Sequence, residues 1–141
     1  MVTEYAKDLT WEERHNILIY DQLYVTAKQN RRLVRLKNKV DIAITDSPII
    51  LGMMYRDPNY LPKTFDSMLF ELFNQYKNVN YLLQRKKPYS SIGRNQTEEE
   101  AIVLDLQINE VLDSNSIDYK NVPGDESAMD VILEDLRILL R

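Results

Sequence analysis

Apolar side chains recur every three or four positions in several stretches of the chain. The clearest is 62–76, which predicts an amphipathic helix. A looser pattern over 11–37 predicts one helix or two consecutive ones. Thr97 with Glu100 three residues later forms a capping-box signature that begins a helix ending near residue 112. A last amphipathic helix is expected over 127–140.

Short β-branched stretches alternate with these helices. Strands are expected over 40–46, 79–83 and 117–122. Because helices separate them, the connections should be crossovers and the sheet parallel. We expect the strand at 40–46 to pair with at least one of the other two. The predicted fold class is α/β: a parallel sheet between flanking helices.

The amino-acid composition excludes some classes of site and argues against some classes of function. The 141 residues suit one domain, 1–141, and 44% hydrophobic residues suffice for a packed core. No cysteine is present, so disulfides and cysteine–zinc sites are excluded. A net charge of −4 argues against a general nucleic-acid binder. The sequence shows neither a membrane-spanning segment nor a signal peptide, so we expect a cytoplasmic protein without a membrane partner.

Asp46 stands at the predicted end of a strand, directly before Ser47-Pro48, a helix-start signal. Ligands of open parallel sheets bind beyond the carboxyl ends of the strands. The carboxylate of Asp46 is therefore a candidate for holding Mg²⁺ or a substrate hydroxyl, and the following helix start favours phosphate near Ser47. The alternative is that Asp46 or Ser47 only caps that helix.

Glu4 follows a short β-like segment, Val2-Thr3, and is a candidate general base towards a hydroxyl. The alternative is a solvated N-terminal side chain. If both carboxylates face one cleft, Asp46 should have Glu4, Arg85 or Arg94 as neighbours.

A basic stripe follows one face of the helix predicted over 11–37. Such a stripe binds phosphate or an acidic partner, or it is a solvated helix face. Its members are Lys28, Arg31, Arg32, Arg35 and Lys39.

A polar loop carrying four cations lies between a predicted strand and a capped helix, at about 85–97. This layout is typical of a mobile arginine-bearing lid, and the alternative is an ordinary long loop. Its cations are Arg85, Lys86, Lys87 and Arg94.

Five segments in order resemble the phosphate-binding-loop nucleoside and nucleotide kinases, in particular kinase-like ATP-binding proteins common in tailed bacteriophages. Ribosylnicotinamide kinase and the deoxynucleoside kinases are related branches. The likeness covers nearly the whole chain. The segments are 2–8, Asp21-Gln22-Leu23-Tyr24, 42–48, the lid, and 119–124.

The resemblance implies a role for each matching residue. Glu4 would be the base and Asp46 the Mg²⁺ or substrate ligand, while Arg85 and Arg94 would stabilise the moving phosphoryl group. Substrate contacts would come from Gln22, which reads a nucleobase edge, and from Ser47, Arg31 and Arg32. The cofactor ATP would lie near Lys87, Pro123 and Gly124.

The chain departs from that family at its start, because the first strand, the GxxxxGK[ST] loop and the following helix are missing. Its three glycines are far apart, so they form no phosphate-cradling loop. Two hypotheses follow. The chain is a kinase-like phosphotransferase fold with little or no activity alone, or a non-catalytic module that binds a small molecule or a protein partner. A partner or a second copy would cover the sheet edges that the missing strand leaves open.

Overall fold

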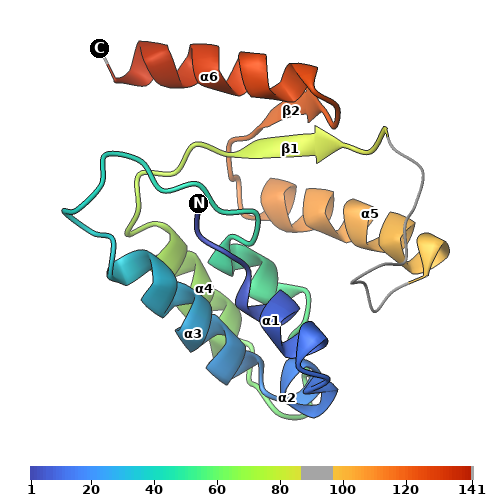
Figure 1. Ribbon diagram of the computed structural model, residues 1–141. Helices are drawn as coiled ribbons and strands as arrows, with labels where there is room; N and C mark the ends of the chain where they lie inside the picture. Colours follow the sequence, from blue (N-terminus) through green and yellow to red (C-terminus); the bar gives the residue numbers. More distant parts are fainter. Residues whose placement is uncertain (87–96, 141) are drawn as a thin grey trace.

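The computed structural model describes residues 1–86 and 97–140, and the elements below belong to that part of the chain. In the second half of the chain, helices and strands alternate (Figure 1). In chain order they are α1 (Tyr5–Trp11), α2 (His15–Tyr20), α3 (Gln22–Val34), the 3-10 helix η1 (Ile49–Met53), α4 (Thr64–Phe73), β1 (Tyr81–Gln84), α5 (Glu98–Ser114), β2 (Lys120–Pro123) and α6 (Ser127–Leu139).

Helices α1 to α4 gather in one part of the molecule, and β1 and β2 lie in the other between α6 and α5 (Figure 1). The 3-10 helix η1 joins the two parts, since it contacts α3, α4 and α5. Its residues Ile49 and Ile50 are buried against Phe73 of α4 and Leu112 of α5. Burial of these side chains stabilises the packing of η1 against α4 and α5.

Strands β1 and β2 pair in parallel, with Tyr81 opposite Lys120 and Gln84 opposite Pro123. Two of the three predicted strands are thereby confirmed, and so is the parallel sheet. The predicted pairing of 40–46 with one of these strands is wrong, because β1 and β2 pair with each other. The ladder continues one residue further, where the amide of Gly124 donates to the Gln84 carbonyl over 2.8 Å.

The prediction of a strand over 40–46 is wrong. Only Thr45 pairs there, in an isolated parallel bridge with Val2, and the described residues form a two-stranded sheet without it. Val40, Ile42 and Ile44 are 38–56% exposed. Their β-branched side chains suit a strand, but a strand needs a paired neighbour.

The N-terminal half agrees with the prediction in one respect and differs from it in another. The pattern over 11–37 resolves into α2 and α3, with Asp21 between them accepting a hydrogen bond from the Tyr24 amide at 3.0 Å. Helix α1 was not expected, because Val2-Thr3 suggested extended chain up to Glu4. The extended segment is real but short, and the helix begins at Tyr5.

The described residues therefore form a mixed helix and strand fold with a small parallel sheet. Among them, none of the helices combines the length and the apolar character that crossing a membrane requires.

Candidate functional site

A cavity of about 660 Å³ lies between the N-terminal segment, α2, α3 and η1. Its wall mixes carboxylates, amides and hydroxyls with apolar side chains, as small-molecule sites do. Glu4, Lys7, His15, Gln22, Thr26, Gln29, Asp46, Ser47 and Tyr55 supply its polar groups, and Leu18, Val25, Pro48, Ile49 and Leu51 are among its apolar ones.

Two carboxylates come together at this cavity because two distant segments run side by side. The amide of Val2 donates to the Ile44 carbonyl over 2.7 Å, and Val2 and Thr45 form the parallel bridge. The segments point the same way, so Glu4 and Asp46 leave the bridge at the same end. Both line the cavity, and Glu4 is one of the three neighbours expected for Asp46.

Neither Asp46 nor Ser47 caps the following helix. The residue before η1 is Pro48, which makes no side-chain cap bond. The Ser47 amide donates to Thr45 Oγ1 at 3.2 Å, so this turn is held by the threonine. The capping alternative is therefore wrong, and the exposed carboxylate of Asp46 borders the cavity.

Electrostatics single out Glu4. Burial raises the pKa of its carboxyl group above the ordinary 4.5, and the charge of Asp46 raises it further, while Lys7 opposes the shift. Burial and the charge of Glu4 in turn raise the pKa of Tyr55. A carboxylate with a raised pKa is suited to accepting a proton near neutral pH.

Another part of the cavity wall is a buried polar face of α3. Gln22, Thr26 and Gln29 are each about 5% exposed, and they fall at helical spacing on one side of α3. Gln22 Nε2 donates to the Leu18 carbonyl at 2.7 Å, and Gln29 Oε1 accepts from the Tyr5 amide at 2.9 Å. Buried amides of this kind orient a ligand through its hydrogen-bonding groups.

Four of the residues predicted from the sequence meet at this cavity: Glu4, Gln22, Asp46 and Ser47. Five others lie elsewhere. Arg85 pairs with Asp105 of α5 over two contacts of 3.0 Å. Arg31 is exposed, and Arg32 holds the N-terminal segment. Pro123 and Gly124 lie at the end of the ladder between β1 and β2. Lys87, Arg94 and most of the predicted lid lie outside the described residues.

Sequence reasoning missed Gln29, Lys7, His15 and Tyr55 as cavity residues. A signal existed for Gln29, because Gln22, Thr26 and Gln29 recur at helical spacing around Val25. No comparable pattern marks the other three, which reach the cavity through tertiary packing.

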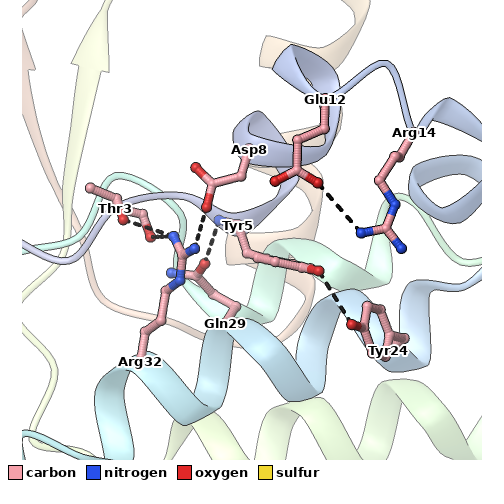
Figure 2. Close-up of polar contacts among 8 residues, drawn as sticks. All are labelled: Thr3, Tyr5, Asp8, Glu12, Arg14, Tyr24, Gln29 and Arg32. Carbon is pink, nitrogen blue, oxygen red and sulfur yellow. Dashed lines mark hydrogen bonds and ion pairs between the residues drawn. The ribbon is translucent and has the colours of Figure 1, made fainter.

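Arg32 and Gln29 hold the backbone at Thr3 and Tyr5 (Figure 2), the residues before and after Glu4 in the sequence. From α3, Arg32 donates to the Thr3 carbonyl at 2.9 Å and to Thr3 Oγ1 at 2.7 Å, and it forms an ion pair with Asp8. The bond from the Tyr5 amide to Gln29 holds the next residue. The backbone around Glu4 is therefore held by two residues of α3 that lie about one turn apart.

Replacing Arg32 with Met should lower the free energy of unfolding by about 1–2 kcal/mol, because charge-assisted bonds to Thr3 and Asp8 are lost at a half-buried site. Urea denaturation measures the change, and hydrogen exchange should show faster opening of residues 2–10. The neighbouring exposed Arg31 is the matched control, and Arg31→Met should cost under about 0.5 kcal/mol. Equal losses in the two variants would contradict the anchoring role.

The pH dependence of stability provides a test of Glu4. Since burial and Asp46 raise its folded-state pKa above 4.5, the folded chain binds more protons than the unfolded chain between the two values. The free energy of unfolding contributed by Glu4 therefore falls as pH rises through that window. Glu4→Gln should be more stable than the parent above the window, and the gain should vanish below it. Denaturation at a series of pH values checks this, and parallel pH profiles would refute it.

Within residues 1–86 and 97–140, no three acidic or histidine side chains gather as a ready-made metal site. Compared with protein-family models, with curated proteins and with solved structures, the chain shows no match. The chemistry of the cavity therefore carries the functional inference.

Proposed function

We propose that the cavity binds a nucleoside or nucleotide and that the chain supplies the acceptor half of a kinase-like phosphotransferase. The observation that carries this proposal is the meeting of Glu4 and Asp46 with the buried amides of α3 around one cavity. A volume of about 660 Å³ lies within the range of small-molecule sites.

Each wall has a role in this proposal. Glu4 accepts the proton of a ligand hydroxyl, because its raised pKa matches the pH of the cell more closely than that of an ordinary carboxylate. Gln22 and its apolar neighbours Leu18 and Val25 surround the nucleobase. Heterocyclic bases combine flat apolar faces with polar edges, which this mixture of side chains suits.

Mg²⁺ fits the site chemically. The ion usually takes one or two carboxylates and completes its shell with water and phosphate oxygens, and Asp46 beside Glu4 offers such a donor set. When bound, it would neutralise phosphate charge.

ATP does not fit the described residues in the same way. Gly124 approaches the backbone of Gln84 closely, and Arg85 is engaged by Asp105. We therefore propose residues only for binding the molecule that accepts the phosphoryl group.

The proposal also includes the fold of the phosphate-binding-loop kinases, in which a parallel sheet lies between two layers of helices.

A second candidate is a ligand-binding module that transfers nothing. The pairing of Arg85 with Asp105, away from the cavity, favours it. In this case the same nucleoside or nucleotide occupies the cavity, and Glu4 only accepts its hydrogen bond.

Calorimetry with nucleosides, nucleoside monophosphates and ATP–Mg²⁺ tests both candidates, followed by mass spectrometry of each bound nucleoside after incubation with ATP–Mg²⁺. Binding with formation of a phosphate ester supports the phosphotransferase, and binding of an unchanged nucleoside supports the module. ATP alone should bind at about millimolar Kd or weaker, because the sequence has no loop to cradle its phosphates. A chain that binds no nucleoside or nucleotide contradicts both.

A further inference from the structure

Gln29 leaves one buried donor without a partner. The residue is 4% exposed, and its Nε2 has no hydrogen-bond partner among the described residues. Its Oε1 is occupied by the Tyr5 amide at 2.9 Å. Buried polar groups are nearly always hydrogen-bonded, so an unpaired amide NH₂ on a cavity wall points to a ligand or a bound water.

The position of this donor is defined by the chain around it. Gln29 accepts from the Tyr5 amide (Figure 2), which belongs to the peptide group that links Glu4 to Tyr5. Since that contact holds Oε1, the buried NH₂ group is the end of the side chain without a partner among the described residues. Gln29 and Glu4 both line the cavity, so a side chain with an unused donor and a carboxylate belong to the same wall.

Few ligand groups satisfy both neighbours. A carbonyl accepts from Gln29 but offers nothing to the ionised Glu4, and an ammonium group donates to Glu4 but leaves Gln29 unpaired. A hydroxyl does both, because its oxygen accepts one hydrogen bond while its proton donates another.

We infer that Gln29 Nε2 donates to the oxygen of a ligand hydroxyl whose proton points at Glu4, which makes Gln29 a specificity-determining residue for alcohols. The inference rests on the proposed nucleoside site and adds the group of the ligand that is recognised. A site that hydrogen-bonds a hydroxyl rejects the analogue lacking it, because its own polar groups are then left unpaired.

The experiment compares two pairs of ligands on three proteins. Thymidine and adenosine are each compared with their 5′-deoxy analogues by calorimetry, on the parent chain, Gln29→Met and Gln22→Met. The parent should prefer the hydroxyl-bearing ligand by roughly tenfold or more, and Gln29→Met should reduce this preference about three- to tenfold. Gln22→Met is the matched control from the same face of α3. It should weaken both ligands equally, because its Nε2 is already bonded to Leu18.

The outcomes separate the inference from the proposed function. If the parent binds nucleosides and the folded Gln29→Met variant keeps the full hydroxyl preference, Gln29 does not contact the hydroxyl and the inference fails alone. If the parent binds neither nucleosides nor nucleotides, both proposals fail.

A second measurement needs no variant, which matters if Gln29→Met does not fold. In the proton–nitrogen correlation spectrum of the parent chain, the side-chain NH₂ signals of Gln29 should move on adding thymidine. They should stay in place with 5′-deoxythymidine. Equal shifts with both ligands, or none with either, would overturn the inference.

Discussion

Nucleoside affinity is expected to fall about 10- to 100-fold when Glu4 is replaced by Leu. A hydrogen bond from a ligand hydroxyl to an ionised carboxylate is worth about 1.5–3 kcal/mol, and leucine offers no acceptor. The half-buried position of Glu4 keeps solvent from replacing that bond fully. Calorimetry with thymidine and adenosine measures the loss.

Glu12→Leu is the matched control for this prediction. Glu12 is an exposed carboxylate that follows α1 and contacts Arg14 at 3.4 Å, and it does not line the cavity. Its replacement should leave affinity unchanged within experimental error. Glu4→Gln should fall between the parent and Glu4→Leu, because its amide oxygen still accepts a hydrogen bond. Comparable losses at Glu4 and Glu12 would show that net charge, not contact, controls binding.

The second large effect concerns Gly124. A Cβ atom there would lie 2.4 Å from the Gln84 carbonyl oxygen, closer than such atoms approach. Because the neighbour is backbone within the parallel ladder, it cannot turn aside as a side chain does. Gly124→Ala should therefore lower the free energy of unfolding by about 2–3 kcal/mol, as measured by urea denaturation.

Gly52→Ala provides the comparison. A Cβ there meets Leu69 Cδ1 at 3.0 Å and Thr26 Oγ1 at 3.1 Å, and both are side-chain rather than backbone atoms. Its cost should be smaller than that of Gly124→Ala. The reverse order would mean that the close approach of β1 and β2 is not what requires glycine.

The elements that the sequence predicted well are those with strong local signals. The apolar face of α4 and the capping box of α5 are examples, and Thr97 and Glu100 make both bonds of that box. A capping box and an apolar helix face are both formed by residues that are close together in the sequence. A single stretch of sequence is therefore enough to predict such a helix.

The strand expected at 40–46 shows the opposite case. Its alternation of apolar residues satisfies the strand pattern, yet among residues 1–86 and 97–140 its only bridge joins Thr45 to Val2. Whether such a segment becomes a strand depends on distant residues, and a local pattern does not contain that information.

The residues of the candidate site also fall into two groups, those that local patterns predicted and those that depend on distant contacts. Glu4 and Asp46 follow extended segments, and reasoning from strand ends placed them together, although a single bridge rather than a sheet joins them. Arg32 was expected at the substrate because of its charge, but Thr3 and Asp8 engage it. The importance of Gln29 arises from its contact with Tyr5, 24 residues away in sequence, which no local motif records.

The most direct test of the proposed site is to locate nucleoside binding on the protein by backbone and side-chain amide NMR. Thymidine and adenosine, titrated to millimolar concentration, should shift signals of the N-terminal segment, α3 and residues 46–52, with the Gln22 and Gln29 side-chain amides among the largest. Signals of β1, β2 and α6 should remain in place. Shifts confined to those elements, or no shifts at all, would contradict a nucleoside site between α1, α3 and η1.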